Sequence, residues 1–342
     1  MTEIFSNDGQ NGVFCFATWN VRSIQCTKSF VNVSSVIDKS NADIVCLQET
    51  KFGYNKPFEI NNYKYVLKHE TQKMPYGMGF AIRKSLWLNI TVDPNPSERL
   101  CSLSLKTAWG NIHIINVYAP SEVKREKEKE EELKREKDEF YRQLKEKFMV
   151  LPDSDYVFLL GDFNAQVGRN HSSWSTCIGE FGLRQMNDNG QRLLEFCSCH
   201  KLCVTNTYYE GPDENKYTWI HHNPKASNIQ IDLCLIRHEH LKTLIETKSI
   251  PMDKKDHLMV TCHVNLSSQN EIKPFFYEPL LNFLIDQCQY LDHGTILMEH
   301  QLRDFMIRVP SRIFFRAPYQ FEKSMRMPKK KFTPRATWID LH

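Results

Sequence analysis

The chain has 342 residues, of which 41% are hydrophobic and 12% aromatic, so it can bury a sizeable core in one large domain or two smaller ones. Its formal net charge of +3 is too small to indicate nucleic-acid or membrane binding by itself. No apolar run approaches the roughly 20 residues of a membrane span, and a secretory signal pattern is absent from the first residues. We therefore expect a nuclear or cytoplasmic protein that is neither secreted nor bound to a membrane.

The eleven cysteines are scattered without the spacing of a disulfide framework. Most of them, such as Cys46 and Cys101, lie in apolar segments, which favours reduced and buried thiols. Cysteine and histidine gather in the stretch 197–203, but their spacing matches no common zinc-ligand pattern. Because Cys197 and Cys199 face different sides of a helix, we do not expect a zinc site there.

The first part of the chain predicts a β–α–β unit. Residues 14–19 form an apolar strand that ends at Asn20, and apolar residues recur at helical spacing over 30–37. Residues 42–47 form a second buried strand, which leads into Glu49. A strand, a helix and a strand with short joins indicate a parallel strand pair.

The next part predicts a strand, a hairpin and a charged helix. Residues 77–82 form the strand, whose two glycines we expect to allow close packing. Residues 100–106 and 112–118 flank a glycine-containing turn and predict a β-hairpin that ends at Tyr118. Residues 122–147 are mostly Glu and Lys with one apolar stripe at helical spacing. This pattern favours a solvated helix lying on the domain over a coiled-coil helix.

The apolar run 156–160 predicts a strand buried on both faces, and the other polar clusters make most sense as partners of the residues that follow it. Asp162 and Asn164 lie two residues apart, so in extended backbone their side chains point to the same side. One offers an acceptor that can polarise a water molecule, and the other offers amide donors for an anionic oxygen. By itself, the same stretch also fits an ordinary strand-to-turn junction.

Beyond this strand, the pattern predicts one amphipathic helix over 191–202 and strands over 204–208, 217–220, 228–236 and 258–266. A lone carboxylate, Asp232, lies inside one of these strands, and Asp256 and His257 precede the last one. From 267 on, no strand pattern is present, and a stretch rich in Lys and Arg is interrupted by prolines. We expect a folded domain over 12–266 and a basic, poorly ordered extension over 267–342.

Polar residues of the types used in phosphate chemistry share a position at or near the ends of these strands: Asn20, Glu49, Tyr118, Asp162, Asn164, Asp232, Asp256 and His257. Strand ends are where α/β folds assemble their sites. The set holds carboxylates for a hard divalent cation, donors for phosphate oxygens, and a histidine next to an aspartate, as phosphodiester hydrolysis requires. Neither a nucleophile motif, a Walker loop nor a dinucleotide fingerprint competes with this interpretation.

The order of the motifs resembles that of the endonuclease/exonuclease/phosphatase superfamily, which includes the apurinic/apyrimidinic endonucleases and deoxyribonuclease I. The matching motifs are Thr18–Arg22, Leu47–Thr50, Asn116–Pro120, Gly161–Ala165, Ile231–Asp232 and Asp256–His257. Within the superfamily, the chain is most similar to LINE-type retrotransposon endonuclease domains and to craniofacial development protein 2-like proteins. The resemblance covers 12–266 and implies a DNase I-like α/β fold: a four-layered sandwich of two mixed β-sheets flanked by helices.

The resemblance implies a metal site as well. Glu49 would ligate Mg²⁺, or Mn²⁺ in its place, with Asn20 beside it, and Asp256 would support the metal or the histidine. Two residues depart from the family pattern. Arg22 stands where the abasic-site enzymes carry an aspartate, and Lys255 stands where a serine or threonine usually precedes the Asp-His pair. An added cation beside the histidine would either grip phosphate or weaken catalysis.

The remaining roles follow from the same resemblance. Asp162 would orient and deprotonate the attacking water, while Asn164 and Tyr118 would hold the phosphate. His257 would bind the scissile phosphate, with its imidazole oriented and polarised by Asp232. These roles together imply a Mg²⁺-dependent phosphodiester hydrolase.

Such a hydrolase would most simply be a DNA endonuclease of retrotransposon type, with DNA favoured over RNA as the partner. Within enzymes, the alternatives are an RNA nuclease or deadenylase and a phosphoinositide phosphatase, because the motifs handle the phosphate and not what is attached to it. The alternative of another class is a catalytically weakened nucleic-acid-binding or scaffold protein on the same fold.

Overall fold

Residues 11–268, apart from 53–55, 69–75, 123–126, 184, 224 and 253–255, are described by a computed structural model of the chain. Lys255 and the predicted basic extension, except for residues 267–268, lie outside the described residues. The predictions made for them, including the boundary between the two regions, stay predictions.

Two β-sheets form the centre of the described fold. The first sheet has seven strands in the order β12 (Leu244–Ile250), β13 (Met259–Asn265), β1 (Val13–Asn20), β2 (Ile44–Gln48), β5 (Met78–Arg83), β4 (Tyr63–Lys68) and β3 (Phe58–Ile60). The second sheet has six strands in the order β10 (Leu202–Val204), β11 (Asp232–Arg237), β9 (Tyr156–Asp162), β8 (Gly110–Tyr118), β7 (Leu100–Thr107) and β6 (Ile90–Val92). Both sheets are mixed, because β1 pairs parallel with β2 and β8 pairs parallel with β9, whereas the other neighbours pair antiparallel.

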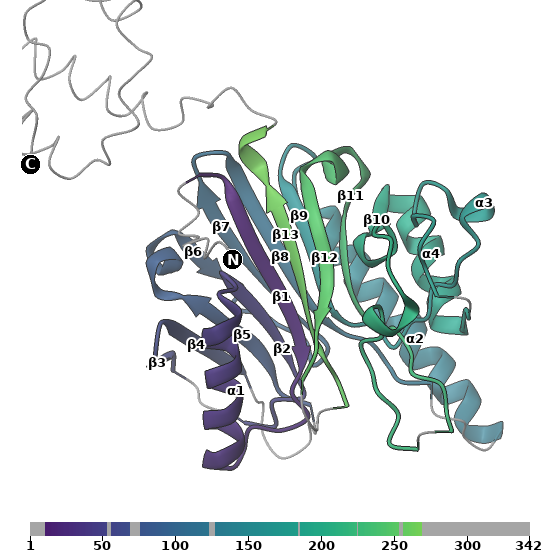
Figure 1. Ribbon diagram of the computed structural model, residues 1–342, viewed down its shortest axis with the longest axis horizontal. Helices are drawn as coiled ribbons and strands as arrows, with labels where there is room; N and C mark the ends of the chain where they lie inside the picture. Colours follow the sequence, from purple (N-terminus) through teal and green to yellow (C-terminus); the bar gives the residue numbers. More distant parts are fainter. Residues whose placement is uncertain are drawn as a thin grey trace, which may run out of the picture. The chain divides into compact units, whose positions relative to one another are not determined.

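Helices cover the outer faces of both sheets (Figure 1). They are α1 (Thr27–Ser40), α2 (Lys127–Met149), the single turn α3 (His171–Trp174) and α4 (Asp188–His200). Apolar side chains of α1 pack on the first sheet, and those of α2 and α4 pack on the second. A third apolar cluster fills the space between the sheets, where the rings of Phe16 and Phe158 lie 4.8 Å apart. The predicted four-layered sandwich is confirmed.

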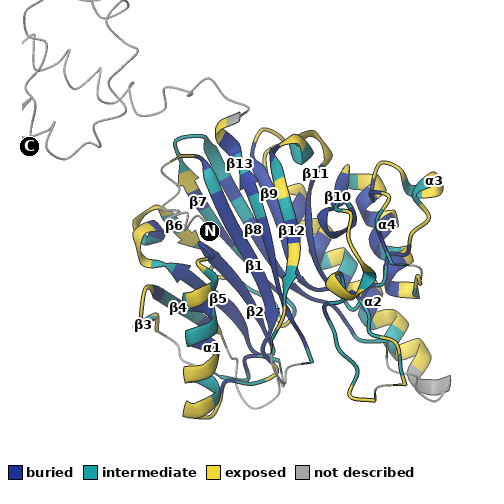
Figure 2. Ribbon diagram, in the orientation of Figure 1, coloured by how far each residue is buried: buried dark blue, intermediate teal, exposed yellow. Residues whose placement is uncertain are grey.

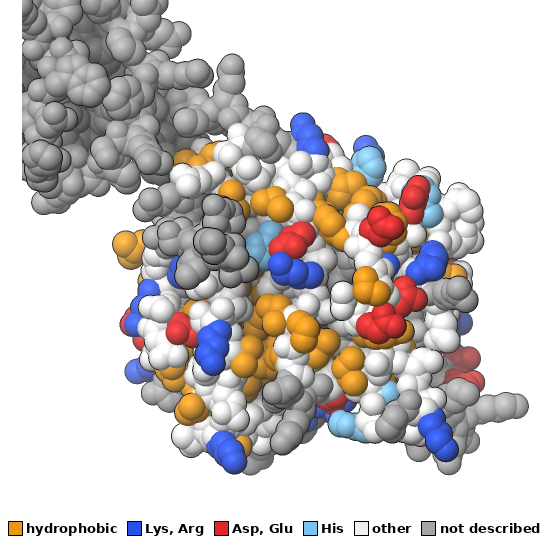
Figure 3. Space-filling model, in the orientation of Figure 1, with side chains coloured by type: hydrophobic (Ala, Val, Ile, Leu, Met, Phe, Trp, Pro, Cys, Tyr) orange, Lys and Arg blue, Asp and Glu red, His pale blue; other side chains and the backbone are white. Residues whose placement is uncertain are grey.

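The charged helix lies on the domain as predicted. Its apolar stripe, with Phe140, Leu144 and Phe148, is buried against the second sheet, while its other sides are largely exposed (Figure 2). Among the described residues, no helix combines the length and the apolar character that crossing a membrane requires. On the face shown in Figure 3, the described Lys and Arg side chains are interspersed with acidic and hydrophobic ones rather than gathered in a broad basic patch.

The first β–α–β unit is also as predicted, and its parallel register places Asn20 opposite Gln48. Glycines allow close approach at two strand pairs. A Cβ atom at Gly79 would lie 2.2 Å from Val66 O, which confirms the expected close packing. A Cβ atom at Gly161 would lie 1.9 Å from Val117 O, so β9 comes close to β8 only because this residue lacks a side chain.

Helix α4 begins and ends earlier than the predicted 191–202. Its first turn starts at Asp188 because Asn187 caps it, with the side chain accepting a hydrogen bond from Gly190 N at 2.8 Å. It ends at His200 because Lys201 adopts left-handed backbone, with φ of 53°. The predicted strand 204–208 is also displaced, since β10 ends at Val204 and a 3₁₀ turn follows.

Two further boundaries were predicted wrongly. The stretch 217–220 is no regular strand, although Trp219 forms isolated bridges with Ile229 and His257. The strand predicted over 228–236 begins only at Asp232, where the pairing with β9 starts. Strands β3, β4, β6 and β12 were not predicted at all.

The ten cysteines of the described residues are all free thiols, and most of them are buried, which agrees with the expectation of reduced thiols. Cys197 lies in the core and Cys199 is exposed, so the two thiols face opposite sides of α4.

Candidate active site

The predicted site residues come together where strands of the two sheets end side by side. Tyr118 lies opposite Asp162 in the parallel pair of β8 and β9, and Asp232 lies opposite Asp162 in the antiparallel pair with β11. Asn20 ends β1, and Glu49 directly follows β2. Register within the second sheet therefore aligns Tyr118, Asp162 and Asp232. Packing of the first sheet against the second adds Asn20 and Glu49.

Asn20 connects the carboxylates of the two sheets. Its Nδ2 donates to Glu49 Oε1 at 2.9 Å and to Asp162 Oδ2 at 3.0 Å, and its Oδ1 accepts from Arg22 N at 3.1 Å. Tyr118 OH donates to the same Glu49 Oε1 at 3.0 Å. A buried amide with every polar group engaged holds the two carboxylates at a fixed separation.

The Glu49 carboxylate is stabilised in its charged form. Burial raises its pKa, but hydrogen bonds from Asn20 and Tyr118 lower it more, and Lys51 Nζ, 3.3 Å from Oε2, lowers it further. The net direction is below the ordinary value of 4.5, so this carboxylate is ionised at neutral pH. Burial and the neighbouring Glu49 charge raise the pKa of Tyr118, which keeps its hydroxyl protonated as a donor.

Asp162 has the opposite tendency. Burial and the charge of Asp232 raise its pKa from 3.8 to about 7, although His257 and the hydrogen bonds from Asn20 and Asn164 N oppose the rise. The backbone N–H of Asn164 donates to Asp162 Oδ1 at 2.9 Å. A carboxylate that titrates near neutral pH between fixed donors is suited to exchange a proton with a water molecule.

His257 is held as a cation by the surrounding acids. Burial lowers its pKa, but the charge of Asp232 and the hydrogen bond to it raise the pKa to about 9, with Asp162 adding to the rise. His257 Nδ1 donates to Asp232 Oδ2 at 3.0 Å, and its Nε2 lies 4.0 Å from Asp162 Oδ2. The backbone is anchored as well, because Trp19 Nε1 donates to His257 O at 3.1 Å.

Asp256 lies behind the histidine. Its Oδ1 accepts from His257 N at 3.0 Å, and its Oδ2 pairs with Arg22 Nε at 2.7 Å. Of the two roles predicted for Asp256, these contacts favour support of the histidine over support of the metal. Arg22 therefore joins the carboxylate cluster through Asp256 and through Asn20.

Backbone geometry marks the same positions. Arg22, Glu49 and Asn164 adopt left-handed backbone, with φ of 57°, 50° and 48°, although none is glycine. Such conformations cost free energy and persist only where the surroundings over-determine them, and they gather at functional sites.

The donor set fits a hard divalent cation. Glu49 and Asp162 share the Asn20 amide, and ligand atoms of Asp162 and Asp232 lie within 4.8 Å of each other, while His257, held as a cation, offers hydrogen bonds and no lone pair to a metal. Carboxylate and amide oxygens are the ligands that Mg²⁺, Mn²⁺ and Ca²⁺ prefer. The residues present therefore suit the predicted ion, and the Glu49 side chain is more exposed than that of Asp162, at 16% against 3%.

Several contributors escaped sequence reasoning. Thr218 Oγ1 accepts from the backbone N–H groups of Ile231 and Asp232 at 2.9 Å each, which fixes the start of β11. Asn187 and Asn189 contact the Asn164 loop from the first turn of α4. The sequence signal near these residues is the pair Asn189-Gly190, which indicates a turn before a helix and no role in a site.

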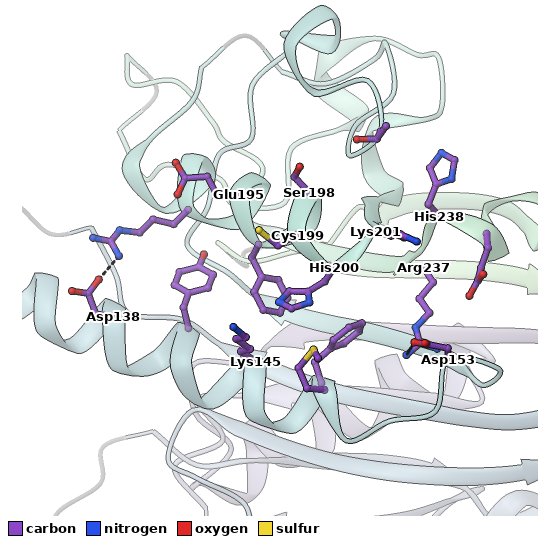
Figure 4. A pocket seen from close by; sticks show the side chains of 17 residues that line it. Asp138, Lys145, Asp153, Glu195, Ser198, Cys199, His200, Lys201, Arg237 and His238 are labelled. Carbon is purple, nitrogen blue, oxygen red and sulfur yellow. Dashed lines mark hydrogen bonds and ion pairs between the residues drawn. The ribbon is translucent and has the colours of Figure 1, made fainter.

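A second group of charged and aromatic side chains lines a groove of about 1230 Å³ between α2 and α4 (Figure 4). It includes Cys199 and His200 of the stretch considered for zinc. None of the predicted site residues lines this groove.

The protein is an α/β sandwich in which carboxylates and a histidine gather where strands of the two sheets end. The chain belongs to the Endonuclease/Exonuclease/phosphatase family, whose sequence pattern matches residues 17–251. It is 29% identical over 239 residues to craniofacial development protein 2 of Bos taurus, covering 70% of this chain and 38% of that protein. The chain thus spans about two fifths of the length of this curated relative.

Solved structures share the fold at low sequence identity. The AP endonuclease LMAP from Leishmania major is 14% identical with a TM-score of 0.55, covering 74% of this chain and 88% of that one. The endonuclease domain of TRAS1, a telomere-specific non-LTR retrotransposon, is 12% identical with a TM-score of 0.51, covering 75% of this chain and 99% of that one.

Proposed function

We propose that the protein is a divalent-metal-dependent phosphodiesterase that cleaves nucleic acid internally, with DNA as its substrate. One observation carries the proposal: Asp162 is held between the Asn20 amide and the His257–Asp232 pair, at the edge where Glu49 also lies. In this proposal, a proton acceptor (Asp162), a cation (His257) and a carboxylate for the metal (Glu49) surround the point where the phosphate would bind.

In the proposed reaction, Asp162 accepts a proton from the attacking water, and its pKa of about 7 suits this task at neutral pH. His257 holds its charge through Asp232 and offers Nε2 to a phosphate oxygen, where negative charge develops as the water attacks. Asn164 and the protonated Tyr118 hydroxyl donate to the remaining phosphate oxygens.

Glu49, with Asn20 beside it, would hold the ion. When bound, it would act as a Lewis acid on a phosphate oxygen and offset the charge of the phosphate. Without it, Glu49 is balanced by Lys51 and by the two donors on Oε1.

DNA is favoured because the structures that share the fold are named as an AP endonuclease and a retrotransposon endonuclease domain. The relation to the TRAS1 domain also supports a retrotransposon-type enzyme. The free thiols support a nuclear or cytoplasmic location.

The test is nicking of supercoiled plasmid DNA by the full chain, with Mg²⁺, with Mn²⁺ and with excess chelator. We expect nicking only with a divalent ion, and Glu49→Gln should raise the ion concentration required. Matched RNA oligonucleotides and a phosphoinositide test the other substrates. Full activity in chelator would contradict the metal requirement, and binding without cleavage of any substrate would identify a non-catalytic protein.

A further inference from the structure

The loop that carries Asn164 is held by the first turn of α4. Asn164 has left-handed backbone, and its carbonyl oxygen accepts two side-chain hydrogen bonds. Asn187 Nδ2 donates to it at 3.0 Å and Asn189 Nδ2 donates to it at 3.1 Å. Two asparagine amides on one carbonyl fix the peptide plane that follows Asn164.

Asn187 links this loop to the helix through both ends of its amide. Its Oδ1 accepts from Gly190 N and from Gln166 N at 2.8 Å each, so the same oxygen caps α4 and binds the loop. Its backbone N–H donates to Gln166 O at 3.1 Å. A Cβ atom at Gly190 would lie 1.8 Å from Gln166 O, so the helix approaches the loop this closely only with glycine there.

Asn189 links the loops that follow β8 and β9. Its side chain is almost fully buried, and Nδ2 donates to Pro120 O at 2.8 Å as well as to Asn164 O. Asn164 Nδ2 in turn donates to Ala119 O at 2.9 Å. The hydrogen bonds of Asn189 therefore hold together the two segments that present Tyr118 and Asp162.

We propose that Asn187 and Asn189 are positioning residues for the reaction of this site: they fix the Asn164 backbone, and through it the Asp162 carboxylate. The connection runs through the backbone of one residue: the two asparagines bind the carbonyl oxygen of Asn164, and its N–H donates to Asp162 Oδ1 at 2.9 Å. Neither asparagine is among the residues that the motifs indicated. The inference rests on the proposed hydrolysis, and on hydrogen bonds that exist whatever the substrate is.

One substitution separates positioning from capping. In Asn187→Asp, the carboxylate keeps the acceptor for Gly190 N and Gln166 N, and a negative charge suits a helix N-terminus. The donor to Asn164 O is lost. We expect kcat for plasmid nicking to fall at least tenfold with a smaller change in KM, while the melting temperature stays close to that of the wild type. Asn187→Ala also loses the N-cap of α4 and should have a lower melting temperature than the wild type.

The matched control is Asn170→Asp. Asn170 caps the short helix α3 in the same way, by accepting from Ser173 N at 3.4 Å, and it contacts none of the site residues. This variant should keep wild-type kcat. Wild-type kcat in Asn187→Asp would overturn the positioning role.

A readout that does not depend on catalysis keeps the two proposals apart. If wild-type protein hydrolyses nothing, the proposed function fails, and amide hydrogen exchange over residues 160–168 decides the inference. Faster exchange of this segment in Asn187→Asp than in Asn170→Asp supports the positioning role, and equal exchange overturns it.

Discussion

Two regions of the molecule gather titratable and aromatic side chains: the strand ends around Asp162 and the groove between α2 and α4 (Figure 4). In the groove, Arg192 Nη1 pairs with Asp138 Oδ1 at 2.5 Å, but the Asp138 side chain is 55% exposed. At the strand ends, the side chains of Asp162 and His257 are 3% and 4% exposed. The two regions hold similar residue types and differ in access to water.

The difference shows why composition alone does not identify a site. Ion pairs that are exposed to water contribute little to stability. Buried charged groups need oppositely charged or hydrogen-bonding partners. Burial and the neighbouring charges shift the pKa values of such groups. Of the two regions, the strand ends are the one where Asp162, a carboxylate with its pKa raised to about 7, lies beside His257, whose pKa is raised to about 9 by neighbouring acids.

The largest expected effect on the hydrolysis rate comes from replacing one carboxylate at the strand ends, whereas the same replacement in the groove should have little effect. Asp162→Asn keeps the size of the side chain but removes the proton acceptor and one of its two hydrogen-bond acceptors, so hydrolysis should fall by about 10²- to 10⁴-fold. Asp138→Asn in the groove makes the same chemical change in an exposed pair and should keep its rate within about twofold. Initial rates of plasmid nicking measure both. Equal losses in the two variants would show that the groove takes part in the reaction.

Breaking the buried pair should cost both activity and stability. In Asp232→Asn, His257 loses its counter-ion, so the rate should fall by about 10²-fold. The unfolding free energy should drop by about 1–3 kcal/mol, because the imidazole loses a charged partner. Urea denaturation measures the second effect. The control Asp213→Asn alters an exposed pair with Arg169 and should change the unfolding free energy by less than about 0.5 kcal/mol.

The pH dependence of stability should also originate at the strand ends. The pKa of Asp162 is raised in the fold from 3.8 to about 7, so ionisation of this group destabilises the fold progressively between those values. The pKa of His257 is raised from 6.5 to about 9, so its contribution is present below 6.5 and lost towards 9.

Melting temperatures measured from pH 5 to pH 9 should accordingly fall as the pH rises. Asp162→Asn should flatten the lower part of this curve, since its amide cannot ionise. A variant whose melting temperature falls with pH as steeply as that of the wild type would show that ionisation of Asp162 is not the cause.

A smaller effect is expected at Arg22. Its side chain is 49% exposed and tied to Asp256 through Nε, so the rest of the guanidinium is available to a substrate phosphate. Arg22→Gln should weaken DNA binding and reduce the slope of log affinity against log salt by about one. Arg142 is the control, being 55% exposed and paired on α2. The same change of slope in Arg142→Gln would show that the effect of Arg22→Gln comes from the change in net charge and not from a contact with phosphate.

The smallest effects belong to the groove itself. Lys145→Ala and Cys199→Ser remove side chains that line it. Both variants should nick DNA within about twofold of the wild-type rate and unfold within about 0.5 kcal/mol of it. Activity lost at unchanged stability would place the groove within the functional surface.

Most of the residues at the strand ends could be predicted from the amino-acid sequence. Long apolar runs such as 14–19 and 156–160 indicate buried strands, and the polar residue after each run marks where that strand leaves the core. The order of the motifs implied the sandwich through resemblance to a known family. The period of apolar residues indicated the solvated helix at 122–147, because it reports which side of a helix is buried. Short or edge strands such as β6 and β12 escaped, since they are half exposed and carry no clear period.

How the strand ends meet could not be predicted, because it depends on contacts between distant parts of the chain. Asn20 binds a carboxylate 142 positions away, and two asparagines of α4 bind the Asn164 loop across the start of a helix. The pKa values of Asp162 and His257 likewise depend on burial and on charges from other strands, which no local pattern encodes. Hydrophobic periodicity is a property of neighbours along the chain. Electrostatics and hydrogen bonding at this site are properties of neighbours in space.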